Sequence, residues 1–371
     1  MSSVIPSVAV VLPPREGFGP GRAGAIGLLV RRLVQTPGFD TVVFGGRQDG
    51  PVFPGIRFQS IGPSVWTLGN TNIRYAAAVG DALKALKPAL VEVHNRPEIA
   101  LALASRLNSI PVTAVIHNDP QAMREANSPL QRTVLLGRLA RVVTNSEYLR
   151  RRLMDGVNAP TRLPVVLPNC LDFTELPPQG NREKLILFAG RVVADKAPDV
   201  FVTACAAALP DLPGWRAEII GADRFSRGSP DTAFIKMVRA LAESAGVRML
   251  GYRDHPEVLA AMARAAIVVV PSRWAEPFGL VALEALASGA ALICSRRGAL
   301  PEVAGDAAVY ADPDHSAEIA AAIGMLAHDE SRRTAMAAAG RQRARQFDVA
   351  VVVQKLAALR RDVLNVAARR D

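Results

Sequence analysis

Short apolar runs alternate along the chain with longer amphipathic stretches. The apolar runs are rich in β-branched residues and stand at 7–13, 41–46, 89–95, 111–117, 141–146, 184–190, 215–221, 247–251, 266–272, 291–295 and 307–310. Between them, stretches such as 72–87 and 130–140 place apolar residues at helical spacing. Strands that alternate with helices in this way predict βαβ units and parallel sheets, so we expect an α/β fold.

The alternation is interrupted once, near residues 171–184. Proline, glycine and charged residues replace the periodic pattern there, which is typical of a linker. We therefore expect two Rossmann-like α/β domains, at residues 1–175 and 176–349, that face each other across a cleft. Residues 317–371 show helical spacing throughout, and the final helix, at about 350–371, is expected to pack on the first domain.

Composition narrows the class of protein. Of 371 residues, 50% are hydrophobic and 21% are charged, which is typical of a globular protein with ordinary cores. Three cysteines, Cys170, Cys205 and Cys294, are odd in number and far apart, so they predict neither a disulfide framework nor a zinc site. The N-terminus has no basic leader and no apolar run reaches 18 residues, so we expect a cytoplasmic protein.

The net charge of +10 predicts an anionic partner. No nucleic-acid module is visible and aromatic residues make up only 5% of the chain, which argues against nucleic acid. A basic tail runs from Arg341 to Arg370, and it predicts peripheral attachment to an anionic inner-membrane surface.

A glycine-rich segment follows the first apolar run. Gly19, Gly21 and Gly24 spell G-x-G-x-x-G, the pattern of a dinucleotide-binding turn. Gly19 comes seven residues after Leu12, however, which is too long for that tight turn, and the second apolar run ends in Arg47 rather than an acidic residue. An NAD(P)-dependent oxidoreductase remains an alternative, but we read the segment as a flexible loop that brings backbone close to a ligand.

The stronger signal lies after the apolar run at 266–272. Glu276 and Glu284 are separated by seven residues, and the pattern between them predicts a helix from about Phe278 to Gly289. Glu276 would then lie in the preceding loop and Glu284 about a turn and a half into the helix. The exposed amides at such a helix start form an anion site.

Two cations follow the apolar run at 184–190. Arg191 comes directly after that run and Lys196 lies five residues further on, where a helix is expected to begin. Cations at a helix start oppose the helix dipole, so a bound anion would explain them. They would neutralise a departing diphosphate as its bond to carbon breaks.

These segments resemble a known family. The stretches GRVVADKAPDV, PSRWAEPFGLVALEALASG and RRGALPEV, with AVIHNDP, VVTNSEYLRRRL and VVLPNCLDF in the first half, resemble retaining glycosyltransferases of family 4, which have the GT-B fold. The similarity extends to bacterial enzymes of lipopolysaccharide-core and exopolysaccharide synthesis. It implies a nucleotide sugar, linked to UDP or GDP, as co-substrate, a saccharide or lipid-linked acceptor, retention of configuration, and no metal or other cofactor.

The resemblance also implies roles for individual residues. It places His117, Glu276, Arg191 and Lys196 at the reacting groups, and it adds Phe278, Gly279, Leu280 and Glu284 as donor contacts. Gly19, Gly21 and Arg253 are further candidates for the donor, and Arg15, His94 and Asn95 are candidates for the acceptor. Arg297 departs from the glycine that is usual in the family, and Asp312–Asp314 is read as a turn rather than as a metal-binding Asp-x-Asp. A non-catalytic nucleotide-binding protein on the same fold is the remaining alternative.

Overall fold

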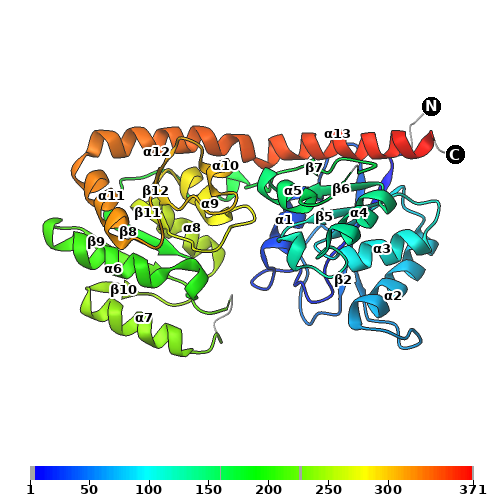
Figure 1. Ribbon diagram of the computed structural model, residues 1–371, viewed down its shortest axis with the longest axis horizontal. Coiled ribbons are helices and arrows are strands. Elements are labelled where there is room, and N and C mark those ends of the chain that lie inside the picture. Colours follow the sequence, from blue (N-terminus) through cyan, green and yellow to red (C-terminus); the bar gives the residue numbers. More distant parts are fainter. Residues whose placement is uncertain (1–4, 159, 225–227, 370–371) are drawn as a thin grey trace. The chain divides into compact units, whose positions relative to one another are not determined.

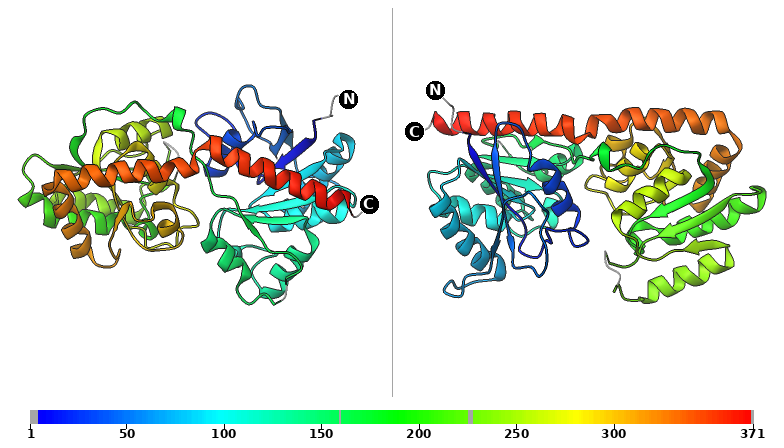
Figure 2. Two further views of the ribbon diagram at one scale, coloured as in Figure 1. Left: turned by 90° about the horizontal axis from the view of Figure 1, so that it is seen from above. Right: turned by 180° about the vertical axis from the view of Figure 1, so that it is seen from behind.

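The computed structural model describes residues 5–158, 160–224 and 228–369. It divides into two compact units (Figures 1 and 2). Unit 1 consists of Met1–Cys170 and Val349–Asp371, and unit 2 consists of Leu171–Asp348. The predicted fold class, α/β with two Rossmann-like sheets, is confirmed.

Unit 1 is built on a parallel sheet. In its described residues the sheet has seven strands in the order β3-β2-β1-β4-β5-β6-β7. The strands are β1 (Ser7–Val11), β2 (Asp40–Gly46), β3 (Phe58–Ile61), β4 (Leu90–His94), β5 (Val112–Ile116), β6 (Arg141–Thr144) and β7 (Val165–Val166). The helices are α1 (Ala25–Leu33), α2 (Thr71–Leu86), α3 (Pro97–Arg106), α4 (Pro129–Arg138), α5 (Glu147–Met154) and α13 (Val349–Ala368).

The two faces of this sheet are covered by different helices. Ala9 and Val11 of β1 pack in one core cluster with residues of α2, α3, α4 and α5. Val8 and Val10 point to the opposite face, as successive strand residues do, and pack with α1 and α13. Since both faces are buried, the strands read as nearly continuous apolar runs, which is why the sequence pattern located most of them.

Unit 2 repeats the plan. In its described residues the parallel sheet has six strands in the order β10-β9-β8-β11-β12-β13. The strands are β8 (Glu183–Ala189), β9 (Arg216–Ile220), β10 (Val247–Met249), β11 (Ala265–Val270), β12 (Ala291–Cys294) and β13 (Ala308–Tyr310). The helices are α6 (Pro198–Ala208), α7 (Ala233–Ser244), α8 (His255–Arg264), α9 (Leu280–Ser288), α10 (Leu300–Ala304), α11 (Ser316–His328) and α12 (Glu330–Ala344).

Each sheet reverses its strand order once. In unit 1 the reversal falls between the neighbours β1 and β4, and in unit 2 between β8 and β11. Ligands of open parallel sheets bind outside the carboxyl ends of the strands at such a reversal. The segments that leave these four ends are 12–24, 95–96, 190–197 and 271–279, so most of the candidate site residues fall at these two places.

The chain leaves unit 1 and re-enters it at adjacent positions of unit 2. Leu171 forms an isolated β-bridge with Asp348, and its amide donates to the carbonyl of Phe347 at 2.9 Å. Leu171 is also buried in the core of unit 2. The division therefore lies at 170/171 and 348/349, a few residues from the positions 175/176 and 349/350 expected from composition.

The C-terminal stretch is helical but interrupted. Residues 317–371 were expected to be helical throughout, whereas the chain breaks after α11 at Asp329, and a short 3-10 turn, η5 (Arg345–Phe347), separates α12 from α13. Asp329 is extended and its side chain caps α12 by accepting from the amide of Arg332. Capping of this kind favours a new helix start over continuation.

Candidate functional site

The start of α9 forms an open anion-binding end in unit 2. Gly279 precedes the helix with φ +97°, a left-handed conformation that favours glycine, and an added Cβ there would lie 2.6 Å from Leu300. Gly279 has no side chain to cap the helix, no side chain of the described residues caps the first turn in its place, and no acidic residue occupies that turn. The first amides, beginning with that of Leu280, are therefore available to an anion. The side chain of Phe278 is buried against Phe347, so only its backbone faces this end.

Lys196 and Glu276 are brought together across the strand reversal. Lys196 ends the 3-10 turn η3 (Ala194–Lys196) after β8, and Glu276 lies after β11. The ammonium Nζ of Lys196 donates to Oε1 of Glu276, and both side chains are mostly buried, with exposed fractions of 23% and 11%. Arg191, the other predicted cation, is half-buried after β8 and has no hydrogen bond or ion pair within the described part of the chain.

The backbone of Glu276 is fixed by Gly298. The two residues form an isolated β-bridge, and the amide of Ala299 donates to the carbonyl of Glu276 at 2.8 Å. Gly298 has φ +64°, and an added Cβ would lie 2.3 Å from both N and O of Glu276. A glycine is therefore required here to let the two segments approach.

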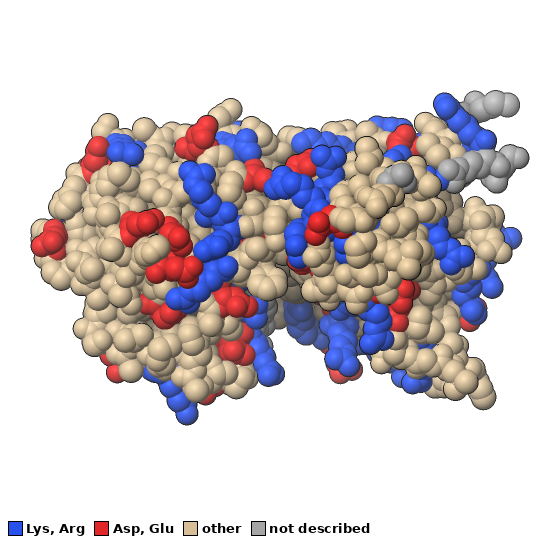
Figure 3. Space-filling view, viewed as in Figure 1, with Lys and Arg blue, Asp and Glu red and all other residues tan. Residues whose placement is uncertain are grey.

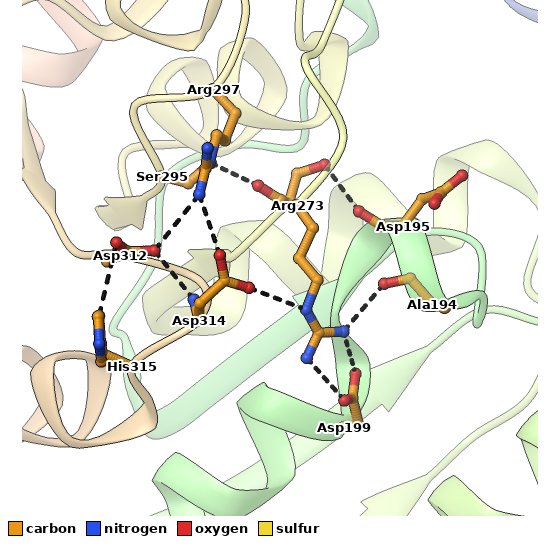
Figure 4. Close-up of polar contacts among 10 residues, drawn as sticks. Ala194, Asp195, Asp199, Arg273, Ser295, Arg297, Asp312, Asp314 and His315 are labelled. Atoms are coloured by element: carbon orange, nitrogen blue, oxygen red, sulfur yellow. Dashed lines mark hydrogen bonds and ion pairs between the residues drawn. The ribbon is translucent and has the colours of Figure 1, made fainter.

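A network of ion pairs braces the same loops (Figure 4). Arg273 makes a bidentate pair with Asp199 at 3.0 and 2.9 Å, and its Nε lies 3.4 Å from Asp314. The carbonyl of Asp195 accepts from the amides of Arg273 and Trp274, both at 2.9 Å. These contacts join the segments that follow β8, β11 and β13. They therefore restrict the movement of the two segments that carry Lys196 and Glu276.

Arg297 belongs to this network. Its guanidinium lies 3.0 Å from Asp314 and 3.7 Å from Asp312, while the amide of Asp314 donates to Oδ1 of Asp312 at 3.0 Å (Figure 4). Asp312–Asp314 is thus a turn whose carboxylates pair with arginine. The sequence did not predict the contacts of Arg297, which stands where the family usually has glycine. In the structure its partners are Asp312 and Asp314.

Glu284 has a partner that sequence reasoning missed. It is buried in α9, and its Oε1 lies 2.7 Å from Nε2 of His255, the first residue of α8. The candidate base contact Arg253, two residues earlier, is exposed and donates to the carbonyl of Tyr252. The sequence signal that could have found it was its position, because His255 follows β10 at the carboxyl end of the sheet and begins α8, with a proline next to it in the first turn.

In unit 1, three candidate residues form one buried cluster. Nδ1 of His94 lies 2.9 Å from Nε2 of His117, and the two rings stack with centroids 5.1 Å apart. The side-chain carbonyl of Asn95 accepts from the amides of His117 and Asn118 at 3.1 and 3.2 Å. Asn95 has φ +54°, a conformation that Asn tolerates better than most residues.

Both histidines of this cluster are held neutral. Burial, followed by the charge of Arg360, lowers the pKa of His94 to about 3. Burial and the neighbouring His94 lower the pKa of His117 well below its ordinary value. In a neutral pair that shares one hydrogen bond, one ring donates and the other accepts, so each histidine fixes the tautomer of the other. His94 and Asn95, candidates for acceptor contact, thus also orient His117.

The glycine-rich segment is shaped by Glu16. Its Oε1 accepts from the amide of Gly27 at 2.9 Å, so the carboxylate occupies the start of α1, where a dinucleotide fold would bind phosphate. Burial raises the pKa of Glu16, while hydrogen bonds from Gly27 and Gly24 and the charge of Arg96 act in the opposite direction. An added Cβ at Gly24 would lie 2.7 Å from this carboxylate. These contacts oppose the dinucleotide interpretation.

The remaining candidates in this segment differ in exposure. Gly19 is buried, and an added Cβ would lie 2.1 Å from the carbonyl of Pro51, so its role is packing. Gly21 is exposed with φ +69° and has open space around it. Arg15, four residues after the end of β1, is also exposed. Gly21 and Arg15 are therefore the two of these candidates that a ligand can reach.

Solved structures of other proteins share the fold of this chain. The solved structure of sucrose-phosphate synthase from Thermosynechococcus elongatus has a TM-score of 0.78, with 18% identity over 97% of this chain and 100% of that one. The Anabaena protein Alr3699/HepE in complex with UDP has a TM-score of 0.75, with 18% identity over 95% and 99%. These likenesses define the fold as GT-B.

Sequence comparison gives the family. The profile described as Glycosyl transferases group 1 matches residues 174–343, and that of Glycosyltransferase Family 4 matches residues 26–175. D-inositol 3-phosphate glycosyltransferase from Kineococcus radiotolerans is 30% identical over 296 residues, which cover 71% of this chain and 68% of that protein. The chain belongs to the family 4 glycosyltransferases.

Other relatives match over different lengths. Glycogen synthase from Mycobacterium tuberculosis H37Rv is 28% identical over 76% of this chain and 73% of its own length. D-inositol 3-phosphate glycosyltransferase from Corynebacterium aurimucosum is 33% identical, but the chain spans only 44% of that relative's length. The relatives that match this chain thus carry different names, so their names do not agree on one reaction.

Proposed function

We propose that the chain transfers a hexose from a nucleotide sugar to a saccharide or lipid-linked acceptor. The observation that carries the proposal is the meeting of Lys196, Glu276 and the uncapped start of α9 at the strand reversal of unit 2. A cation and free helix amides suit a diphosphate, and a carboxylate beside them suits sugar hydroxyls. Dinucleotide oxidoreduction has no comparable support, because Glu16 occupies the start of α1.

Donor binding follows from these groups. Lys196 and Arg191 bind the diphosphate together with the amides of Gly279 and Leu280, and Glu276 accepts from the sugar hydroxyls. Glu284 accepts from the ribose hydroxyls, with His255 holding its carboxylate in place. We favour UDP as the nucleotide, since the structurally similar Anabaena protein binds UDP and UDP-glucose. GDP is the alternative that the same contacts admit.

The proposed chemistry retains the configuration of the sugar. The acceptor oxygen attacks the anomeric carbon on the face from which the diphosphate leaves, the bond from that carbon to the diphosphate oxygen breaks, and the acceptor's proton passes to the departing diphosphate. Lys196 and Arg191 stabilise the growing negative charge without a metal ion. His117, neutral and fixed in one tautomer, offers a positioned hydrogen bond to the reacting sugar.

The acceptor is the least constrained part of the proposal. Synthesis of lipopolysaccharide or exopolysaccharide is our proposal from sequence resemblance. The names of the curated relatives instead suggest D-inositol 3-phosphate or glycogen as alternatives to test. Arg15, the exposed acceptor candidate after β1, would contact the acceptor in each case, and the exposed Gly21 would approach the donor.

The test is a thermal-shift and donor-hydrolysis screen. UDP-, GDP-, ADP- and dTDP-sugars are compared with NADH and NADPH, because a ligand that binds only the folded state raises its melting temperature. We expect one sugar nucleotide to stabilise the protein and to be cleaved slowly, and Glu284→Ala to lose both effects. The exposed Glu243 gives the control variant Glu243→Ala. Stabilisation by nicotinamide cofactors alone would refute the proposal, and binding without turnover on any acceptor would favour a non-catalytic protein.

A further inference from the structure

The loop between β3 and α2 exposes three large apolar side chains. Val65 is 75% exposed, Trp66 94% and Leu68 95%, and the last two are the most exposed large apolar residues in the described chain. The loop, residues 62–70, projects below α2 in Figure 1 and away from the body of unit 1 in the second view of Figure 2. Single exposed apolar residues are common, but three within four positions indicate an interaction surface.

This apolar loop has a braced backbone. The amide of Ser64 donates to the carbonyl of Arg74 at 2.9 Å, and Nε of Arg74 donates to the carbonyl of Ser64 at 2.7 Å. The hydroxyl of Thr67 lies 3.1 Å from that of Ser64, and Asn70 caps α2 by accepting from the amide of Ile73. Because the base of the loop is fixed, its apolar side chains are held outward rather than folded onto unit 1.

The loop lies at the same sheet edge as the acceptor candidates. It leaves the carboxyl end of β3, which is parallel to β4 and β5 through β2 and β1. The side chains of Asn70 and Asn72 donate to Glu98 at 2.6 and 3.0 Å. Glu98 stands in the first turn of α3, four residues after His94. A partner that binds the loop therefore lies at the same edge of the sheet as His94 and Asn95, the candidates for acceptor contact.

The charge of the chain is concentrated in the unit that carries this loop. Unit 1 contains 24 lysines and arginines against 12 acidic residues, whereas unit 2 contains 20 against 22. Beside the loop, Arg74 donates to the carbonyl of Ser64, and Arg124 is 66% exposed, with its guanidinium 3.6 Å from the carboxylate of the buried Glu98. Figure 3 shows the abundance of Lys and Arg on one face of unit 1, and no charged side chain at the tip of its lower projection.

Two cations of the basic C-terminal tail are engaged within the fold. Arg360 is 1% exposed and pairs with Glu92, and Arg343 donates to the carbonyls of Glu302 and Val303. Arg370 lies outside the described residues. Within the described residues, no helix combines the length and apolar character needed to cross a bilayer. Arg345, Lys355 and Arg361 of the tail remain exposed, so part of its charge is still available to an anionic surface.

We propose that the loop 62–70 inserts Val65, Trp66 and Leu68 into the headgroup region of an anionic bilayer. Tryptophan favours the membrane interface, and each nearby arginine adds about a fivefold preference for anionic lipid. The basic excess of unit 1, with the exposed Arg124 beside the loop, supplies that attraction. The inference deepens the proposed function and rests on its lipid-linked acceptor, because docking at this edge brings such an acceptor to His117 from the bilayer.

The experiment measures co-sedimentation of the full chain with unilamellar vesicles in the absence of donor. One set is pure phosphatidylcholine, and the other contains equal parts phosphatidylcholine and phosphatidylglycerol. We expect binding to the anionic set, with the partition coefficient lowered about tenfold or more by Trp66→Ser with Leu68→Ser. Leu163→Ser is the matched control, because Leu163 is 61% exposed and precedes β7 at the opposite edge of the same sheet.

A second readout reports insertion directly. Brominated lipid quenches a tryptophan that enters the bilayer, so quenching should be strong in the wild-type chain and weak in Trp66→Phe. The inference is overturned if the double variant partitions like the wild type, if neutral vesicles bind equally well, or if no vesicle binds. It is also overturned if sedimentation velocity without lipid shows that the double variant only loses self-association. A donor-induced thermal shift that persists in such a case leaves the proposed function standing by itself.

Discussion

Gly298→Ala tests whether the position of Glu276 matters for transfer. The added Cβ would lie 2.3 Å from both backbone N and O of Glu276, so the two segments must separate by about 0.7 Å to reach 3.0 Å. Backbone atoms on both sides leave no side-chain rotation that relieves the contact. A misplacement of about 1 Å near a reacting group can lower the rate about a hundredfold.

The expected result is a value of kcat/KM for the donor that falls roughly tenfold to a hundredfold. A residue other than glycine at φ +64° also costs about 1 kcal/mol of folding free energy, and the contact adds about 1–3 kcal/mol. The assay is transfer or donor hydrolysis at saturating and limiting donor, with the melting temperature measured on the same samples. A fully folded fraction must be established before rates are compared.

Gly246→Ala is the matched control. Gly246 also has a positive φ, +67°, but it is exposed and an added Cβ would meet no atom within 4 Å. Its variant carries a similar conformational cost without touching Glu276. If Gly298→Ala keeps the activity of Gly246→Ala, the position of Glu276 does not govern transfer and the assignment is wrong.

Three further results are expected. Arg360→Met should lower the free energy of unfolding by about 3–5 kcal/mol by leaving Glu92 buried and unpaired, and adding Glu92→Met should restore most of it in a urea titration; equal losses in both variants would contradict this. The pKa of His94 falls from 6.5 in the unfolded chain to about 3 when folded, so stability declines as pH drops through that window. His94→Phe should therefore flatten the acid-side slope by about 1.4 kcal/mol per pH unit, and an unchanged slope would refute the neutral assignment. His255→Ala should weaken UDP binding severalfold in calorimetry by releasing Glu284, and unaltered affinity would exclude that positioning role.

The sheets were predictable because their strands are buried on both faces. Runs such as 7–13 and 266–272 became β1 and β11, since strands of this kind are nearly continuous apolar segments. β3 and β7 were not predicted from the pattern, for two different reasons. β3 is partly exposed, with two exposed residues among its four, and β7 is only two residues long. Neither leaves a periodic signal in the sequence.

Site residues were predictable only where they lie close together in the sequence, within a single motif. Glu276, Gly279 and Glu284 lie within nine residues, so their placement follows from one loop and one helix. The partners of these residues come from distant segments. His255 meets Glu284 across 29 positions, and Glu16 caps α1 from a loop, because tertiary packing rather than sequence spacing brings them together.

Because Glu92 pairs with Arg360, unit 1 cannot complete its fold on the ribosome until after unit 2 has been synthesised. The partners are 268 residues apart, so at about 5–20 residues per second the ribosome delivers Arg360 between about 13 and 54 s after Glu92. Every residue of unit 2 has been made by position 348, whereas α13 of unit 1 emerges only after it. Until then, the sheet face that carries Val8 and Val10 is covered by α1 but lacks the cover of α13. A nascent unit 1 is therefore a natural client for chaperones that shield apolar surface.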